Sequence, residues 1–234
     1  MLCSRPPTRT EEDAGQSGDL FVQSIRLIIW KVPITPRPYK LGQRQIATED
    51  TRRRIVVAAR ELLADDSGPQ GFTVDAIARR AGVARMTVYY QFRSKRGVLE
   101  AVFDHLANAG LMPYLGPVLK EPSPSRALDG LIAAFCAFWN SDRIVLRRAR
   151  ALAALDAEIA ESVRARDERR REHIRRIVGR LRENTGATTV PFIVDVLHVL
   201  TSFETFDALL TSERSVQDVA DIVRRLASAV LDPA

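Results

Sequence analysis

The segment from Arg85 to Gln91 carries side chains whose types and spacing suit contact with DNA bases. If this segment is helical, successive residues turn by about 100°, so Val88 and Phe92 lie on one side. The opposite side then presents a thioether, a hydroxyl, an aromatic ring and an amide, contributed by Met86, Thr87, Tyr90 and Gln91. A solvated helix more commonly carries Glu and Lys there, whereas base edges and thymine methyl groups in a major groove suit this mixture. We therefore expect this helix to read DNA.

Local charge agrees with a polyanionic partner. Between residues 73 and 99, six Arg and Lys residues accompany a single acid, Asp75, and the whole chain has a formal net charge of +6. Neutralising phosphates needs such an excess. Arg85 can bind guanine or phosphate, and Lys95, with the free amides of the helix that starts there, can clamp a phosphate. The alternative is a basic, solvated patch on a helical bundle.

Short helices before and after this segment must position it. Apolar residues at helical spacing predict a first helix over residues 48–64, and Thr73 is expected to cap a short second helix. Gly82 supplies the left-handed residue that ends the second helix, and Ser94 caps the helix after the reading segment. Because the turn at Gly82 is tight, the second and third helices must cross steeply. Residues 48–106 are therefore predicted to form a helix-turn-helix domain.

The run from Gly82 to Phe92, followed by Ser94 and Lys95, resembles the N-terminal domain of the tetracycline-repressor (TetR) family of bacterial regulators. The resemblance covers about residues 48–106. Ala84 and Met86 depart from the Ser or Thr, and the small residue or Pro, that are common in the family at these positions. The resemblance implies an all-α protein that binds DNA through its helix-turn-helix. The expected contact residues are Thr73, Arg85, Met86, Thr87, Tyr89, Tyr90, Gln91 and Lys95.

The remainder, residues 107–234, is expected to form a second, wholly helical domain. Prolines and glycines between residues 113 and 124 indicate a connection. Apolar periodicity then predicts helices over residues 126–140, 143–155, 157–183, 189–212 and 215–231. The family resemblance implies that this helical bundle dimerises through its last two long helices and often encloses a ligand cavity.

Apolar stripes on the last two predicted helices support a homodimer, because two helices from each subunit could form a four-helix interface. The alternative is an ordinary monomeric core. The candidate interface residues are Leu197, Leu200, Phe203, Val219, Val223 and Leu226.

Aromatic and polar side chains within apolar helices are candidates for a ligand pocket, because a small-molecule site needs an apolar wall with a few polar groups. For a single His or Asp of this set, a hydrogen-bonded core residue is the alternative. The candidates are Phe135, Phe138, Trp139, His173, Phe192, Asp195, His198 and Phe206.

Residues 1–47 differ from the rest, because prolines and glycines interrupt them repeatedly. We expect a disordered or loosely attached extension. Two interpretations stay open: a basic arm with Arg37, Lys40 and Arg44 that touches DNA, and an upstream start codon that adds residues without a role.

Other features narrow the class of protein. Cys3 and Cys136, and the three histidines, lack the spacing of a disulfide framework or a metal site, so we expect no metal and no cofactor. No segment reaches the roughly 18 apolar residues of a membrane span, and the order of a secretory signal is missing. A cytoplasmic protein with no membrane partner is expected.

These features together predict a sequence-specific transcriptional regulator. It would be a homodimer that binds a palindromic operator in double-stranded DNA, and a repressor that a small-molecule effector releases. The chain has no Gly-rich phosphate loop, nucleophile elbow or metal signature, so we do not expect an enzyme. The open alternatives are a nonspecific DNA-binding protein and an all-helical enzyme of unknown activity.

Overall fold

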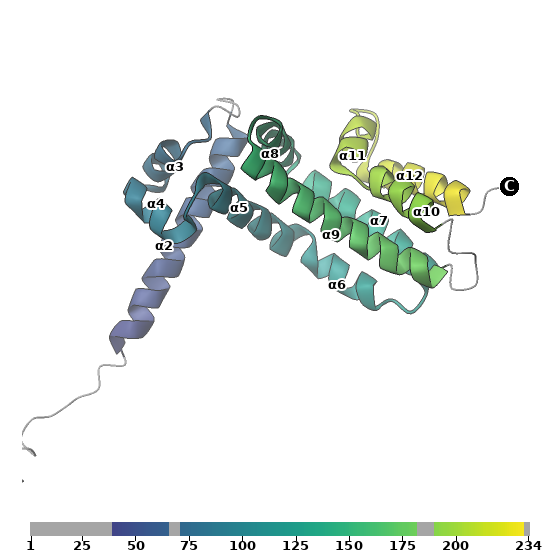
Figure 1. Ribbon diagram of the computed structural model, residues 1–234, viewed down its shortest axis with the longest axis horizontal. Coiled ribbons are helices and arrows are strands. Elements are labelled where there is room, and N and C mark those ends of the chain that lie inside the picture. The colour runs from purple at the N-terminus through teal and green to yellow at the C-terminus, as the bar shows by residue number, and fades with distance from the viewer. Residues whose placement is uncertain (1–38, 66–70, 182–189, 232–234) are drawn as a thin grey trace, which may run out of the picture. The chain divides into compact units, whose positions relative to one another are not determined.

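The computed structural model describes residues 39–65, 71–181 and 190–231, with side chains from residue 44 onward. The chain divides into two units, residues 1–47 and 48–234. Every regular element of the described residues is a helix, as predicted (Figure 1). The helices are α2 (Tyr39–Ala64), α3 (Val74–Ala81), α4 (Arg85–Phe92), α5 (Lys95–Gly110), α6 (Met112–Lys120), α7 (Pro124–Ser141), α8 (Arg143–Leu155), α9 (Ala157–Leu181), α10 (Val190–Leu200), α11 (Phe203–Leu209) and α12 (Val216–Leu231).

Helix α2 begins nine residues before the expected start at Thr48. Its first residue, Tyr39, directly follows Pro38, and no further proline interrupts the chain before Ala64. Gly42 is the only residue of this added stretch with a strong cost in a helix, about 1 kcal/mol, which a long helix tolerates. The expectation for residues 1–38 lies outside the described residues.

Helix α6 occupies a stretch that was expected to be a connection without structure. Pro113 lies in its first turn, where a proline is tolerated because the N–H groups there have no partner within the helix. Pro117 lies inside the helix. Leu115 is buried against the core, so burial of an apolar face favours the helix despite its prolines.

The single helix predicted over residues 189–212 is instead divided into α10 and α11. Ser202 starts α11, because its hydroxyl accepts a hydrogen bond from the Thr205 amide at 3.1 Å. The Thr201 hydroxyl donates to the carbonyl of Leu197 at 2.8 Å, and the Thr201 carbonyl accepts from the Trp139 indole N–H at 3.0 Å. The break therefore gives the buried indole a hydrogen-bond acceptor.

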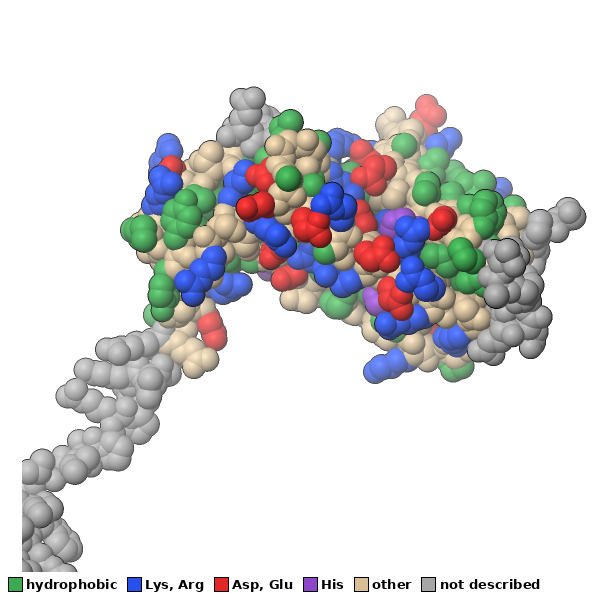
Figure 2. All heavy atoms as spheres, viewed as in Figure 1, with side chains coloured by type: hydrophobic (Ala, Val, Ile, Leu, Met, Phe, Trp, Pro, Cys, Tyr) green, Lys and Arg blue, Asp and Glu red, His purple; other side chains and the backbone are tan. Residues whose placement is uncertain are grey.

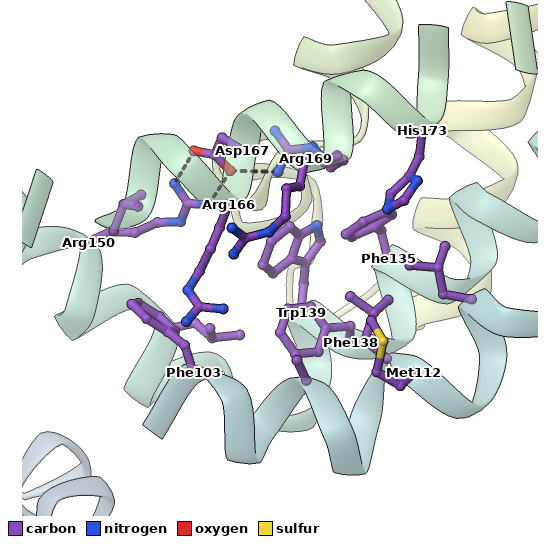
Figure 3. Close-up of a pocket in the computed structure, with 16 residues that line it drawn as sticks. Phe103, Met112, Phe135, Phe138, Trp139, Arg150, Arg166, Asp167, Arg169 and His173 are labelled. Atoms are coloured by element: carbon purple, nitrogen blue, oxygen red, sulfur yellow. Dashed lines mark hydrogen bonds and ion pairs between the residues drawn. The ribbon is translucent and has the colours of Figure 1, made fainter. Parts of the chain in front are cut away.

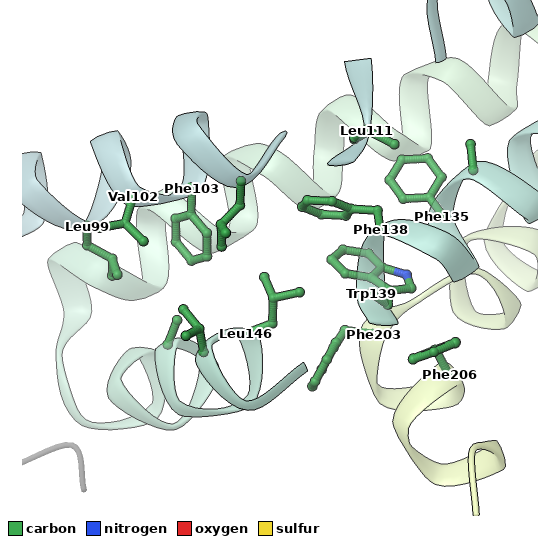
Figure 4. Packing of buried hydrophobic residues seen from close by; sticks show 14 of the residues in the cluster. Leu99, Val102, Phe103, Leu111, Phe135, Phe138, Trp139, Leu146, Phe203 and Phe206 are labelled. Carbon is green, nitrogen blue, oxygen red and sulfur yellow. The ribbon is translucent and has the colours of Figure 1, made fainter. Parts of the chain in front are cut away.

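One hydrophobic core connects the helices of residues 48–234. Helix α7 packs against α6, α9 and α12, and α9 packs against α8 and α10. Figure 4 shows Phe103 of α5 and Leu146 of α8 facing the same core as Phe138 and Trp139 of α7. The ring centroids of Phe138 and Trp139 lie 4.9 Å apart. Because α5 packs against α4 as well as against α6, α7 and α9, it joins the helix-turn-helix to the rest of this core.

Within the described ranges, none of the helices combines the length and apolarity that crossing a bilayer requires. The thiol of Cys136 is buried in α7, and burial raises its pKa to about 11. A thiol with so high a pKa stays protonated and is a weak nucleophile near neutral pH.

Candidate functional site

Local hydrogen bonds define the turn between α3 and α4. The Thr73 hydroxyl accepts from the Ala76 amide at 3.2 Å and so caps α3. At the other end, Gly82 has a φ of 64°, and its N–H donates to the carbonyl of Arg79 at 3.2 Å. The Val83 N–H donates to the carbonyl of Ala78 at 3.0 Å. These contacts close α3 and turn the chain into α4, as predicted.

The corner between α4 and α5 is also tightly built. Arg93 has a φ of 67°, which is unusual for a residue with a side chain. The Ser94 hydroxyl accepts from the Gly97 amide at 3.1 Å and caps α5. A Cβ atom at Gly97 would lie 2.0 Å from the carbonyl oxygen of Phe92, so only glycine fits there without a backbone shift.

As predicted, one side of α4 is buried and the opposite side faces solvent. Val88 is 1% exposed and Phe92 is buried, and both pack in the core. Tyr90 is 76% exposed, and Met86 is also exposed. Thr87 and Gln91 are partly exposed. The Arg52 guanidinium lies 4.3 Å from the centre of the Phe92 ring and fixes the end of α4 by donating to the carbonyl of Gln91 at 3.1 Å.

Arg85 and Tyr89 lie together at the start of the exposed side. The Arg85 guanidinium donates to the Tyr89 hydroxyl at 3.2 Å and to a carboxylate oxygen of Asp75 at 3.2 Å. The hydrogen bond to Tyr89 and the charge of Asp75 raise the pKa of Arg85. Both members of the Arg85–Asp75 ion pair are more than half exposed. Such a pair contributes little stability, so Arg85 can exchange Asp75 for another anion at small cost.

Lys95, like Arg85, is held by an ion pair. Its ammonium lies 2.8 Å from a carboxylate oxygen of Asp156. The other Asp156 oxygen accepts from the amides of Glu158 and Ile159 at 3.1 and 3.3 Å, and so caps the start of α9. The hydrogen bond from Lys95 lowers the pKa of Asp156. One carboxylate therefore links the start of α5 to the start of α9.

A second link between α5 and α9 lies one turn further along. The Ser162 hydroxyl donates to Glu100 at 2.6 Å, and the Nε of Arg96 donates to the same Glu100 oxygen at 2.9 Å. Arg166 donates to Asp104 at 2.9 Å and to the carbonyl of Glu100 at 3.1 Å. The hydrogen bond from Ser162 lowers the pKa of Glu100. Sequence reasoning missed both links, because their members lie about 60 residues apart and follow no periodic pattern.

A cavity of about 160 Å³ lies between α5, α6, α7, α8 and α9. Figure 3 shows the rings of Phe135 and Phe138 toward one end of it and the charged groups of Arg150 and Arg166 toward the other. Apolar side chains form most of the wall, and one acid and several basic side chains complete it. The lining residues are Phe103, Ala107, Leu111, Met112, Leu115, Phe135, Phe138, Trp139, Leu146, Arg150, Val163, Arg166, Asp167, Arg169, Arg170 and His173.

Half of the candidate pocket residues line this cavity, namely Phe135, Phe138, Trp139 and His173. The other four do not. Phe192 is exposed, Phe206 is buried in the core, and Asp195 pairs with Arg171. His198 is half-buried on α10, and burial lowers its pKa. Apolar periodicity within α10 could not show whether its residues reach the cavity. Tertiary packing places the cavity beside α7 and α9 rather than beside α10.

The charged lining residues form a partly buried cluster that the sequence did not predict. Asp167 accepts from Arg150 at 3.2 Å and from Arg170 at 2.8 Å. Burial opposes ionisation of Asp167, but these two arginines outweigh it and lower its pKa. Arg170 of this cluster is only 3% exposed, although it lies within a run of interleaved basic and acidic residues. In the part of the chain that the structure describes, no three His, Cys, Asp or Glu side chains are placed to hold a metal ion.

Comparison with known proteins identifies the helix-turn-helix. Residues 55–102 match the family described as "Bacterial regulatory proteins, tetR family". The HTH-type transcriptional regulator SrpR of Pseudomonas putida is 42% identical over 71 residues, which cover 29% of this chain and 33% of SrpR. Residues 55–102 therefore form a helix-turn-helix of the TetR type. The resemblance noted in the sequence is thereby confirmed.

Other matches extend further along the chain but are less similar. The HTH-type transcriptional regulator EthR of Mycobacterium tuberculosis is 30% identical over 115 residues, which cover 48% of this chain and 53% of EthR. The matches therefore span from about a third to about half of the length of these relatives. The crystal structure of a TetR-like transcriptional regulator from Rhodococcus sp. RHA1 has a TM-score of 0.58 at 20% identity, covering 79% of this chain and 97% of that chain. That likeness shows a shared fold.

The last helices of the described residues expose a different set of apolar residues from the one predicted. Phe192 and Val199 of α10 are 64% and 61% exposed, and Leu226 of α12 is also exposed. Figure 2 shows hydrophobic side chains gathered over α10 and α12. Of the six candidate interface residues, only Leu226 is exposed, at 45%, and Leu200 is partly exposed. The other four, Leu197, Phe203, Val219 and Val223, are buried in the core of their own chain.

Those four residues therefore cannot form a dimer interface without unpacking the chain. Helix α10 is apolar around most of its circumference, so its periodicity did not distinguish the face packed on α9 from the face left open. The exposed Phe192 and Val199 and the partly exposed Val196 follow one face of α10 at spacings of four and three residues.

Proposed function

We propose that this protein is a homodimeric transcriptional regulator that binds a palindromic operator in double-stranded DNA and leaves it when a small molecule binds. The observation that carries this proposal is the exposed side of α4. Tyr90 and Met86 project from a helix whose opposite side, at Val88 and Phe92, is locked into the core. Such a helix fits a major groove, where base edges and thymine methyl groups meet its side chains.

The other expected contact residues surround that helix. Thr73 uses its oxygen to cap α3, which leaves its O–H free to donate to a phosphate. Arg85 and Lys95 are held by single, partly exposed carboxylates, which phosphates can replace. In this arrangement α4 contacts the bases, while Thr73, Arg85 and Lys95, at the starts of α3, α4 and α5, contact phosphates.

Selection of bound fragments from random double-stranded DNA tests this proposal. We expect a two-fold symmetric sequence whose half-sites lie about 34 Å, or one helical turn, apart or a multiple of it. Fragments without any common sequence would instead indicate the nonspecific DNA-binding protein. We propose no catalytic activity, and we place the regulator in the cytoplasm, where bacterial DNA is.

The exposed apolar face of α10 and α12, formed by Phe192, Val196, Val199 and Leu226, is our proposed dimer interface. An apolar patch on two adjacent helices can pair with its own copy around a two-fold axis. We expect Val199→Arg to convert the dimer to a monomer, because it places a charge in the centre of this patch. Light scattering coupled to size-exclusion chromatography measures the change.

Ile144→Arg is the matched control, because Ile144 is an exposed apolar residue on α8, outside this face. It should leave the mass unchanged. A dimer that persists in Val199→Arg at micromolar concentration would show that the subunits meet elsewhere.

We propose that the effector acts through α9, because this helix lines the cavity and also carries the Asp156 cap that holds Lys95. A shift of α9 would move the carboxylate and the lysine together. A ligand changes DNA affinity only by its preference for one of the two states, so the shift needs only a modest difference in ligand binding.

The Lys95–Asp156 ion pair leads to a prediction for Asp156→Asn. Asparagine caps a helix as well as aspartate does, so α9 should stay intact while Lys95 loses its internal anion. We expect DNA affinity to rise by roughly threefold to tenfold at low salt, since the free ammonium can neutralise a phosphate. Fluorescence anisotropy with the selected fragment at several salt concentrations measures this. Asp195→Asn, which removes the partner of Arg171 on α10, should leave the affinity unchanged.

A further inference from the structure

The cavity combines an aromatic wall with an excess of positive charge. Phe103, Phe135, Phe138 and Trp139 supply the rings. Four arginines line it, Arg150, Arg166, Arg169 and Arg170, against one lining acid, Asp167.

Two acids outside the lining also pair with these arginines. Glu204 accepts from Arg150 at 2.9 Å, and Asp104 accepts from Arg166 at 2.9 Å. Three of the four arginines thus pair with three carboxylates, and Asp167 serves both Arg150 and Arg170. The fourth, Arg169, is exposed on α9, so water can solvate its charge.

Arg170 is the lining arginine that most needs another partner. Its side chain is 3% exposed, and its Nε makes no hydrogen bond to any described residue. One of its terminal nitrogens reaches Asp167 at 2.8 Å, and its guanidinium carbon lies 5.7 Å from the Trp139 ring centre. A buried N–H of a charged group without an acceptor costs free energy, so an anion that accepts from Nε would be strongly favoured.

We propose that the cavity binds a benzene-sized aromatic monocarboxylate, with its ring among Phe135, Phe138 and Trp139 and its carboxylate at Arg170. The size follows from the volume of about 160 Å³, because a cavity of about 150 Å³ accommodates benzene. A single carboxylate suffices, because the Nε of Arg170 is the one buried guanidinium N–H that lacks an acceptor among the described residues. This assignment deepens the proposed function, because it names the chemical class of the effector.

The same surroundings disfavour a cationic ligand. Arg170 already lies over the faces of Phe135 and Trp139, and Arg166 lies 4.9 Å from the ring centre of Phe103. The ring faces that would attract an ammonium group are therefore occupied by guanidinium groups, which would repel it.

Three ligands of nearly equal size test whether the cavity prefers an anionic, a neutral or a cationic ligand. They are benzoate, benzamide and benzylamine. Isothermal titration calorimetry on the full chain at pH 7.5, without DNA, should show benzoate binding at least about tenfold more tightly than benzamide, because only benzoate offers the guanidinium an anionic acceptor. Benzylamine should bind more weakly than either. If benzoate does not bind, or if benzamide or benzylamine equals it, the assignment is wrong.

Variants locate the carboxylate. Arg170→Lys keeps the charge but removes the Nε donor, and it should lower benzoate affinity about tenfold without changing benzamide affinity. Arg169→Gln should lower benzoate affinity by about threefold, and it serves as the second test if Arg170→Lys does not fold. Arg164→Gln is the control, because Arg164 is exposed on α9 and pairs with Glu161 outside the cavity. Unchanged benzoate affinity in the folded Arg170 or Arg169 variant would overturn the assignment.

The two proposals fail in different ways. A chain that selects an operator but does not bind benzoate rejects the ligand class alone. A chain that binds benzoate as described but selects no DNA rejects the regulatory function alone. Where both hold, saturating benzoate should weaken binding to the selected fragment by roughly fivefold or more.

Discussion

Replacement of Tyr90 by alanine is expected to lower affinity for the selected operator by about 10- to 100-fold, because one good contact to a base edge or phosphate contributes roughly 1–3 kcal/mol. Tyr90 is 76% exposed and packs against no core residue that its loss would unpack. The melting temperature should therefore stay within about 1 °C of the parent. Fluorescence anisotropy with the operator, together with calorimetry of the free protein, measures both quantities.

Tyr114 provides a matched control for this variant. It is an exposed tyrosine on α6, outside the helix-turn-helix. Tyr114→Ala should leave operator affinity unchanged. If Tyr90→Ala binds DNA as tightly as Tyr114→Ala does, α4 is not the reading helix and the proposed function loses its main support.

Gly97→Ala is expected to have the largest effect on stability. The added Cβ would lie 2.0 Å from the carbonyl oxygen of Phe92, which is a backbone atom and cannot rotate away. Either the α4–α5 corner must open or the Ser94 cap must break, at a cost of about 3 kcal/mol or more. For a chain of this size, that corresponds to a fall in melting temperature of roughly 6–12 °C.

Gly179→Ala makes the same chemical change where nothing obstructs it. Among the described residues, a Cβ atom at Gly179 of α9 would meet no other side chain or distant backbone atom within 4 Å. This variant should gain about 0.5–1 kcal/mol, because alanine loses less conformational entropy than glycine in a helix. Thermal unfolding of both variants therefore gives shifts of opposite sign. Equal melting temperatures would show that the corner is looser than the structure indicates.

Because Gly97 fixes the corner that follows α4, we also expect Gly97→Ala to weaken operator binding. The loss of operator affinity should have a different cause in Gly97→Ala from that in Tyr90→Ala. In Gly97→Ala, a reduced melting temperature accompanies the lost affinity, whereas in Tyr90→Ala the affinity falls alone. The pair of variants thus separates the reading side chain from the backbone that presents it.

The sequence by itself determined the helix-turn-helix, because every signal there is local. The caps at Thr73 and Ser94, the left-handed exit at Gly82 and the buried pair Val88 and Phe92 all act within a few residues. Their hydrogen bonds and helical periodicity are set before any distant contact forms. The exposed and buried sides of α4 could therefore be predicted from the residues alone.

Only the tertiary structure decided which residues meet beyond that domain. The pairs Lys95–Asp156 and Glu100–Ser162 join segments about 60 residues apart, and no local pattern encodes them. Helix α10 is apolar on several faces, so packing against α9 and α12, rather than periodicity, selected which face is buried. The cavity likewise needed tertiary contacts, because arginines such as Arg170 look like a solvated run until α9 is packed against the aromatic rings of α7.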